Sequence, residues 1–331
     1  MNELQQILEI LGSTGTVGGV LATLVKVEGS SYRRPGARML LISDGRRTGS
    51  ISGGCLEDDV IAHAHQVMAT ERPVEVTYDT TAENDLVWGV GLGCHGLVHV
   101  LIEKLPAQPG WAATLLENIR RRVPTELATV WQGPEGTSLG TFLADGLPPE
   151  PAVGVFRQII QPPVALAVFG AGDDAQPLVR FANALGWQVT VVDPRPALAT
   201  QARFPGADAT VVARPEEVTA RVNVGADSLA VIMTHHYRHD LPLLRVLLPR
   251  PLAFLGLLGP KKRAERLLSD LAADGLAVTP EMRARLHAPV GLDLGANNAE
   301  EVALAILAEM QATLAGRDGH PLRERLGPIH G

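Results

Sequence analysis

The chain contains two cysteines, Cys55 and Cys94, and each stands in a glycine-rich stretch of sequence. Cys55 follows Gly53 and Gly54 and precedes an acidic run that begins with Glu57. Cys55 is predicted to open a helix, and the positive end of a helix dipole lowers the pKa of a thiol and makes it a better nucleophile or soft metal ligand. Neighbouring acidic side chains raise the pKa of a thiol, so the sequence alone does not decide whether Cys55 is reactive.

Cys94 is followed by His95 in a loop with glycine at positions 89, 91, 93 and 96. Such a loop can turn backbone N–H groups towards an anion while it presents a thiol and an imidazole. Cys55, Cys94 and His95 lack the paired C-x-x-C spacing of a structural zinc site, so we expect no metal site here. A free cysteine also packs as a small hydrophobe, which is the alternative interpretation. If the two thiols act together, we expect them to face a shared cleft.

A local cluster of positive charge surrounds a predicted turn in the stretch "SSYRRPGARM". Arg33, Arg34 and Arg38 lie here on either side of Pro35 and Gly36. In a chain with a net charge of −7, this cluster predicts a phosphate-binding patch. The alternative is a solvated hairpin tip.

A glycine turn near the middle of the chain has the G-x-G-x-x-A pattern of dinucleotide-binding folds. Gly170, Gly172 and Ala175 form it between a predicted strand and a predicted helix, and Asp193 ends the following strand. The glycines permit a tight turn and close approach of a pyrophosphate, which the helix N-terminus attracts. Asp193 is placed to accept hydrogen bonds from a ribose hydroxyl, which favours NAD over NADP.

Polar residues beside this turn affect what it can bind. Asp173 and Asp174 suit the helix dipole but repel a pyrophosphate, so a Rossmann-like domain that binds no NAD is equally compatible with the pattern. His235, His236 and His239 follow the fourth predicted strand, at the sheet edge where such folds bind ligands. These histidines could contact a ligand, a metal or a partner domain, or simply cap a helix.

From residue 164 onwards, apolar runs alternate with amphipathic helical stretches, which predicts right-handed βαβ units around a parallel sheet. A last helix follows Asn298, with Glu301 placed to complete a capping box. The predicted strands of this Rossmann-like domain are residues 164–170, 187–193, 209–213, 228–234 and 251–259.

The preceding part of the chain predicts a mixed α+β domain. Residues 106–160 are the least regular, although the stretch from 125 to 152 has the pattern of one or two hairpins. We therefore predict an α/β protein with an α+β domain over 1–160 and a Rossmann-like domain over 161–331. The elements predicted before residue 106 are a helix over 4–11, a strand over 19–29 with alternating burial, a hairpin over 37–47, a helix over 60–68 and strands over 73–80 and 96–105.

Composition restricts the remaining possibilities. A chain of 331 residues exceeds one usual core, which also predicts two domains. With 29 Lys and Arg against 36 Asp and Glu, an electrostatically bound nucleic acid is not expected. No apolar run reaches the roughly 18 residues of a membrane span, and the first residues lack a signal-peptide pattern. We therefore expect a cytoplasmic protein whose cysteines are free thiols.

Taken together, these motifs resemble the XdhC/CoxI family of accessory proteins for xanthine dehydrogenase and related molybdenum hydroxylases. The resemblance covers nearly the whole chain apart from residues 106–160. The stretches that carry it are "GSSYRRPGARMLL", "GSISGGCLEDDV" and "GVGLGCHGLVHV" in the first domain, and "FGAGDDAQPLVRFANALGWQVTVVDPRP", "FPGADATVV", "VIMTHHYRHDLPLLR", "FLGLLGPKKR" and "LHAPVGLDLGANNAEEVALAILAEM" in the second.

The resemblance implies a homodimer that binds the molybdenum cofactor, supports exchange of an oxo for a sulfido ligand on molybdenum, and hands the cofactor to a xanthine dehydrogenase-type molybdenum hydroxylase. A cysteine desulfurase is a candidate further partner, and the family's members are not subunits of the mature hydroxylase. The chain departs from many members at Asp173, where they have histidine, and at His95, where they have glycine. The cofactor-binding candidates are Cys55, Cys94, His95, Gly53 and Gly54, with Arg33, Arg34 and Arg38 on the phosphate side and Gly170, Gly172, Asp193 and His235 in the Rossmann-like domain.

Two other functions stay open at this point. One is an NAD-dependent oxidoreductase that uses the glycine turn, with His235 or His236 as the acid or base. No evident catalytic lysine, tyrosine or histidine motif supports this interpretation. The other is an interaction scaffold in which neither site is used.

Overall fold

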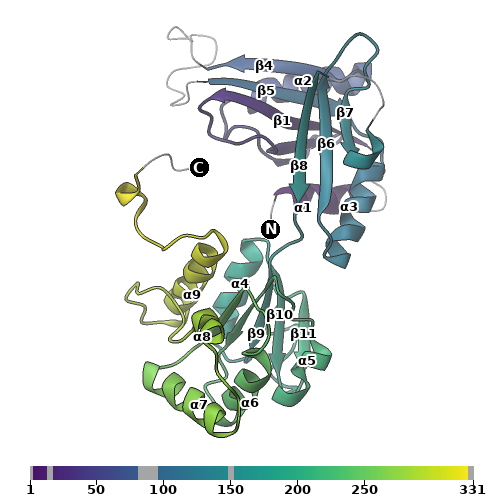
Figure 1. The fold of residues 1–331 in the computed structure, drawn as a ribbon. Helices are drawn as coiled ribbons and strands as arrows, with labels where there is room; N and C mark the ends of the chain where they lie inside the picture. The colour runs from purple at the N-terminus through teal and green to yellow at the C-terminus, as the bar shows by residue number, and fades with distance from the viewer. Residues whose placement is uncertain (1–2, 13–17, 81–95, 148–152, 327–331) are drawn as a thin grey trace. The chain divides into compact units, whose positions relative to one another are not determined.

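A computed structural model describes residues 3–12, 18–80, 96–147 and 153–326 of the chain. The chain divides into two compact units, Asn2–Pro162 and Pro163–Gly331 (Figure 1).

The N-terminal unit contains a five-stranded antiparallel sheet in the order β3-β2-β1-β5-β4. Its longest strand, β1, pairs with both β2 and β5. Helix α2 (Glu57–Thr70) packs on one face through Val60, Ala64 and Val67. The strands are β1 (Gly19–Gly29), β2 (Arg38–Ile42), β3 (Arg47–Gly49), β4 (Val74–Asp79) and β5 (Gly96–Lys104).

The opposite face of this sheet is covered by a second layer that includes a three-stranded antiparallel sheet in the order β7-β6-β8. Leu21 and Leu40 of the first sheet belong to the same core cluster as Leu115 and Leu127 of the covering layer. The first seven residues of β1 are therefore buried on both faces, and the expected alternation of exposure in this strand is wrong. The covering elements are α1 (Glu3–Gly12), α3 (Gly110–Arg121), β6 (Thr125–Gln132), β7 (Gly140–Leu143), a 3-10 helix (Ala144–Gly146) and β8 (Gly154–Ile160).

Polar side chains are buried between the two sheets of the N-terminal unit. The Glu103 carboxylate accepts hydrogen bonds from the backbone N–H of Thr141 at 3.0 Å and from its hydroxyl at 2.5 Å. Arg38 Nη1 donates to Gln158 Oε1 at 2.9 Å, whereas Nε and Nη2 have no hydrogen-bond partner among the described residues. Burial lowers the pKa of Arg38 to about 10 and raises that of Glu103, while the two opposite charges partly offset these shifts.

The C-terminal unit contains a six-stranded parallel sheet in the order β11-β10-β9-β12-β13-β14. With β9 counted first, this is the 3-2-1-4-5-6 order of the Rossmann fold. The predicted fold class and all five predicted strands are confirmed. The strands are β9 (Ala165–Phe169), β10 (Gln188–Asp193), β11 (Ala209–Val212), β12 (Ser228–Ile232), β13 (Phe254–Leu257) and the short β14 (Leu286–His287).

Successive residues of these strands pack on opposite faces of the sheet. Val168 belongs to the core cluster on the side of α4 and α9, and Phe169 belongs to the cluster on the side of α6 and α7. Covered on both faces, the strands are continuous apolar runs, as buried parallel strands usually are. The helices are α4 (Ala175–Ala184), α5 (Val218–Arg221), α6 (Tyr237–Leu247), α7 (Lys261–Ala273), α8 (Pro280–Arg285) and α9 (Ala299–Leu314), with 3-10 turns at Pro215–Glu217 and Leu322–Glu324.

The N-terminus of α9 confirms half of the predicted capping box. Asn298 Oδ1 accepts a hydrogen bond from the N–H of Glu301 at 2.9 Å. The Glu301 side chain accepts from the N–H of Asn297 at 2.7 Å rather than from that of Asn298. Among the helices that the structure describes, including α9, none combines the length and the apolarity required to span a membrane.

The buried pair in the N-terminal unit makes a testable prediction. Glu103→Leu leaves the Arg38 guanidinium buried without an opposing charge, which should lower the free energy of unfolding by about 3–5 kcal/mol. Arg38→Met in the same chain should recover a large part of that loss. Urea denaturation of the wild type, both single variants and the double variant measures the coupling. Strictly additive losses would show that the two side chains do not interact.

Candidate functional site

The loop that carries Cys55 is folded around a carboxylate from its own chain. The Glu57 side chain, only 5% exposed, accepts hydrogen bonds from five backbone N–H groups and two hydroxyls. The N–H donors belong to Ile51, Ser52, Gly53, Gly54 and Leu56, and the hydroxyls belong to Ser50 and Ser52. Converging N–H groups of this kind form an anion-binding nest, and here Glu57 is the anion.

Glu57 is ionised in this environment. Burial opposes the charge, but the hydrogen bonds from Ser52, Ser50 and Gly53 outweigh it and hold the pKa of Glu57 well below its ordinary value of 4.5. Because every donor in the nest points at this group, the backbone from Ser50 to Leu56 has one favoured conformation.

Cys55 is presented on the outside of this ordered loop. Its side chain is exposed, and its N–H donates to Ser52 Oγ at 3.0 Å. Helix α2 begins at Glu57, so Cys55 lies just before the helix instead of opening it. Gly53 and Gly54 have φ values of 118° and 126°, which other residues rarely adopt, and this explains the two glycines before the cysteine.

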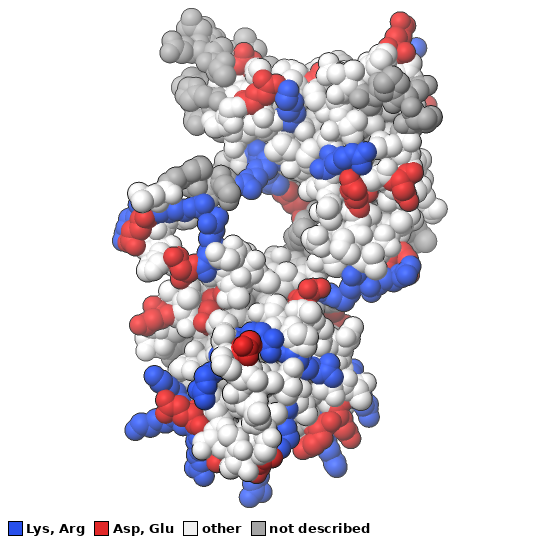
Figure 2. Space-filling model, viewed as in Figure 1, with Lys and Arg blue, Asp and Glu red and all other residues white. Residues whose placement is uncertain are grey.

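The three arginines of the predicted phosphate patch have different surroundings. Arg38 is 3% exposed because it lies on the face of β2 that the three-stranded sheet covers. Arg33 forms a two-point ion pair with Glu3, with one contact at 2.9 Å. Arg34 is exposed and is the member of the cluster that keeps the predicted character. On the face drawn in Figure 2, acidic and basic side chains are interspersed in each unit, and neither forms a continuous field.

Cys94 and His95 lie outside the described residues. The described residues that flank this stretch, Thr80 and Gly96, bond to each other, since Thr80 N–H donates to the Gly96 carbonyl at 2.9 Å and Gly96 N–H donates to Thr80 Oγ1 at 3.0 Å. A Cβ on Gly96 would lie 2.7 Å from the carbonyl oxygen of Ser30. The start of β5 therefore packs against the segment that leads from β1 towards Arg34.

The glycine turn of the C-terminal unit is closed by its own neighbours. A Cβ on Gly170, whose φ is 122°, would lie 2.6 Å from the carbonyl oxygen of Met233, so glycine is required for packing. A Cβ on Gly172 would lie 2.7 Å from Asp174 Oδ1. Asp174 Oδ2 in turn contacts His235 Nε2 at 2.5 Å. The Asp174 carboxylate therefore lies over Gly172, the glycine at which this fingerprint lets a pyrophosphate approach the backbone.

Asp193, the expected ribose acceptor, is bonded within its own unit. Asp193 is 1% exposed, and its Oδ2 accepts from Ala171 N–H and Arg195 Nη2, both at 2.8 Å. Its Oδ1 accepts from Arg195 N–H at 2.9 Å and Arg195 Nε at 2.8 Å. Each carboxylate oxygen therefore accepts two hydrogen bonds from within the chain, which leaves no lone pair to accept a hydrogen bond from a ribose hydroxyl. Asp193 ties the glycine turn to the end of β10.

The histidine-rich loop after β12 is held by contacts within the unit. Asp240, 1% exposed, accepts a hydrogen bond from Thr234 Oγ1 at 2.5 Å and forms an ion pair with Arg263. The rings of His236 and His239 lie 4.9 Å apart. Across the residues that the structure describes, no group of three or more His, Cys, Asp or Glu side chains is arranged to hold a metal ion.

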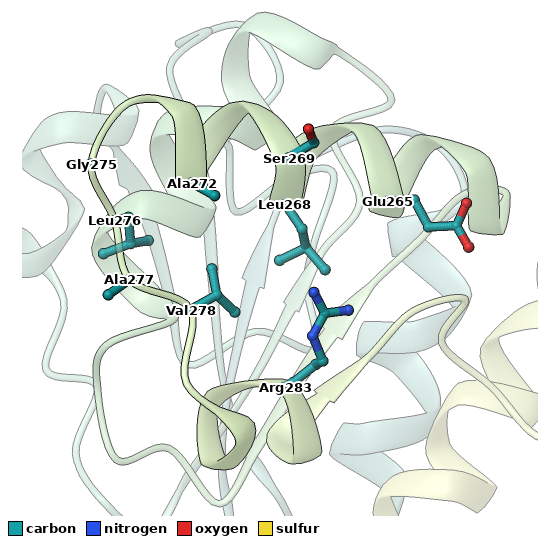
Figure 3. Close-up of a pocket in the computed structure, with 9 residues that line it drawn as sticks. All are labelled: Glu265, Leu268, Ser269, Ala272, Gly275, Leu276, Ala277, Val278 and Arg283. Atoms are coloured by element: carbon teal, nitrogen blue, oxygen red, sulfur yellow. The ribbon is translucent and has the colours of Figure 1, made fainter.

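A separate hollow of about 500 Å³ lies between α7 and the segment that follows it. Figure 3 shows Arg283 pointing towards Leu268, with Leu276 and Val278 on the adjoining loop and Glu265 further along α7. None of the residues that the sequence singled out lines this hollow.

The fold and the loop together define a class of protein, in which an α+β unit with a glycine-rich cysteine loop is followed by a Rossmann unit. Residues 166–310 match the family model described as the XdhC Rossmann domain, and residues 15–79 match that of the XdhC and CoxI family. The chain belongs to the XdhC and CoxI family, which confirms the resemblance found in the sequence.

Three relatives show how far the similarity extends. A probable xanthine dehydrogenase subunit of Bacillus subtilis (strain 168) is 35% identical over 314 residues, covering 89% of this chain and 92% of the relative. The molybdenum cofactor insertion chaperone PaoD of Escherichia coli (strain K12) is 28% identical, covering 88% and 82%. A crystal structure described as a xanthine dehydrogenase from Bacillus halodurans is 32% identical, covers 96% and 97% of the two chains, and has a TM-score of 0.79.

Sequence reasoning missed two residues and one pairing that shape these sites. Glu57 stood out only as one acid among several, although an acid two residues after a Gly-Gly-Cys stretch is a usable signal for a carboxylate-filled nest. Tyr32, whose ring lies against Gly53, carries no signal in a single sequence. The pairing of Asp174 with His235 joins residues 61 positions apart, which only the fold brings together.

We predict that Glu57→Gln destabilises the loop, because the amide turns a donor towards N–H groups that need an acceptor. The expected loss in free energy of unfolding is about 1–3 kcal/mol at neutral pH. Since folding lowers the pKa of Glu57, its contribution is present above the ordinary value of 4.5 and is lost as the pH falls below it. Urea denaturation should therefore show the gap between wild type and variant narrowing in acid.

The exposed neighbour Asp58 supplies the matched control for this prediction. Asp58→Asn removes a charge from the same helical turn without touching the nest, and its stability should stay near that of the wild type. A Glu57→Gln protein as stable as Asp58→Asn at neutral pH would contradict the role given to the nest.

We also predict that NADH does not bind to the glycine turn of the wild-type protein. The Asp174 carboxylate both fills the space above Gly172 and repels a diphosphate. Isothermal titration calorimetry with NADH should give no saturable heat. Saturable binding that Gly172→Trp abolishes would show that the carboxylate moves aside and that this account of the turn is wrong.

Proposed function

We propose that this chain binds the molybdenum cofactor and assists its insertion into a xanthine dehydrogenase-type molybdenum hydroxylase. The proposal is supported by a relative named as a molybdenum cofactor insertion chaperone and by another named as a probable xanthine dehydrogenase subunit, both matched over most of their length. In this role the cofactor is cargo, which the chain must hold and then release.

The observation that carries the proposal is the ordered Cys55 loop. A thiolate is a soft ligand suited to a soft metal centre, and the two glycines before it leave room for a large ligand to approach the backbone. The exposed guanidinium of Arg34 can pair with a phosphate of the cargo. We assign Cys94 and His95 to the same site as the second thiol and its neighbouring imidazole.

A cargo-binding role also agrees with the chemistry of the described residues. Among them, Cys55 offers one exposed thiol to a metal-containing ligand. A ligand held by few direct bonds to its metal can be released to an acceptor protein. The closed glycine turn gives the C-terminal unit a structural or docking role in this proposal, in place of dinucleotide chemistry.

Further parts of the proposal follow the family resemblance. We propose that the chain holds the cofactor while an oxo ligand on molybdenum is exchanged for a sulfido ligand, with a cysteine desulfurase as the source of sulfur. We propose that it acts as a cytoplasmic homodimer, with Asn2–Pro162 as the cofactor-binding domain and Pro163–Gly331 as the Rossmann domain.

Co-purification tests this function. The wild type, Cys55→Ala, Cys94→Ala and the control His236→Ala are each incubated with the molybdenum cofactor and separated from unbound ligand. Molybdenum is then measured by mass spectrometry, and pterin by the fluorescence of its oxidised form. We expect metal and pterin together on the wild type and the control, and less of both on each cysteine variant.

The possible failures of this experiment are distinct. A wild-type protein that retains neither molybdenum nor pterin would contradict the proposed function. Full retention by both cysteine variants would contradict only the assignment of the thiols. Transfer of the bound cofactor to an apo-hydroxylase, followed by its recovered activity, tests the insertion step.

A further inference from the structure

Tyr32 is an exposed aromatic side chain beside the Cys55 loop. Its exposed fraction is 74%, whereas Tyr78 is 3% exposed and bonds to Asp59, and Tyr237 is partly buried against Asp270. Leaving a ring of this size in water forgoes the stabilisation that its burial would supply. Exposed aromatic rings are therefore frequent at ligand-binding surfaces, where a ligand covers them.

The position of the Tyr32 ring is set by the ordered loop. A Cβ on Gly53 would lie 2.9 Å from Tyr32 Cε1 and 3.0 Å from Cδ1, so the ring rests directly on the glycine backbone. The N–H of Gly53 is in turn bonded to the Glu57 carboxylate at 3.2 Å. The nest around Glu57 thus fixes the surface on which the ring lies, while most of the ring stays open to solvent.

The groups around the ring differ in chemistry. The exposed Cys55 follows Gly53 by two positions, so their Cα atoms are within about 7 Å of each other. Arg33, which is ion-paired with Glu3, and the exposed Arg34 follow Tyr32 directly in the chain. An aromatic ring, a thiol and a guanidinium, all on exposed residues, are therefore close to one another along the backbone of these two packed segments.

This combination suits a ligand that is flat, anionic and attached to a soft metal. Stacking of a planar heterocycle on an aromatic side chain contributes about 1–3 kcal/mol and needs no hydrogen bond of defined direction. The molybdenum cofactor has such a heterocycle in its pterin, together with a phosphate and a metal. The inference therefore rests on the proposed function and adds a residue and a contact to it.

We propose that Tyr32 is a ligand-binding residue whose ring stacks on the planar heterocycle of the bound pterin, beside the Cys55 thiol. The ring binds the organic part of the cargo, and the thiol faces its metal. Glu57 acts as a positioning residue, because it holds the loop on which both groups lie.

Three variants separate stacking from other contributions. Tyr32→Phe keeps the ring and removes the hydroxyl, Tyr32→Leu keeps apolar bulk and removes the ring, and Val153→Ala is a control at another exposed apolar position of the same unit. The dissociation constant of the molybdenum cofactor is measured for each full-length protein, with circular dichroism as the check on folding. Molybdate alone is the probe for metal binding without the pterin.

We expect Tyr32→Leu to raise the dissociation constant roughly 5- to 140-fold, which is the stacking contribution converted at tenfold per 1.4 kcal/mol. Tyr32→Phe and the control should stay near the wild type, and molybdate binding should be the same in all four proteins. Equal cofactor binding by Tyr32→Leu and wild type would overturn the inference and leave the proposed function standing. Equal losses in Tyr32→Phe and Tyr32→Leu would overturn stacking in favour of the hydroxyl. No binding by the wild type would overturn both proposals.

Discussion

The hydrogen bonds to the Glu57 carboxylate are the interaction on which the candidate site depends. Five backbone N–H groups that would otherwise need water or a ligand are satisfied by one side chain from the first residue of α2. The loop therefore keeps its shape without a bound anion, and it can hold a thiol and a neighbouring ring in fixed places. Preorganisation of this kind reduces the entropy that a ligand must overcome on binding.

Carboxylates of the chain also satisfy backbone and side-chain donors in the C-terminal unit, but with a different result. There, too, carboxylates of the chain satisfy donors that a ligand could have used, since Asp193 bonds to the glycine turn and Asp174 lies over it. Around Cys55 the internal carboxylate is buried below the surface and leaves the outer groups free. At the glycine turn it lies where the ligand itself would lie. The Glu57 carboxylate thus stabilises the exposed Cys55 loop, whereas the Asp174 carboxylate covers the glycine turn.

Periodicity made the sheets predictable, because continuous apolar runs after residue 164 have few alternatives to buried parallel strands. Side-chain partners were less predictable, since they depend on segments far apart in sequence. Arg38 lies in an exposed-looking basic stretch, yet its partner Gln158 is 120 residues away. Helix α3 was missed although Trp111, Ala112 and Leu115 recur at helical spacing and form its buried face. The exposure of Cys55 could be explained only after the structure showed that the Glu57 carboxylate fills the loop.

The close packing around Gly170 bears on how glycine fingerprints in Rossmann-fold sequences are interpreted. Its hydrogen-sized side chain lets the end of β9 come close to the carbonyl of Met233 at the end of β12, so any larger residue would separate two neighbouring strands. Strand packing alone is therefore a sufficient reason for glycine at this position, independent of any nucleotide. The first glycine of the fingerprint thus reports on strand packing, and the residue that lies over the second glycine is the one that bears on ligand access.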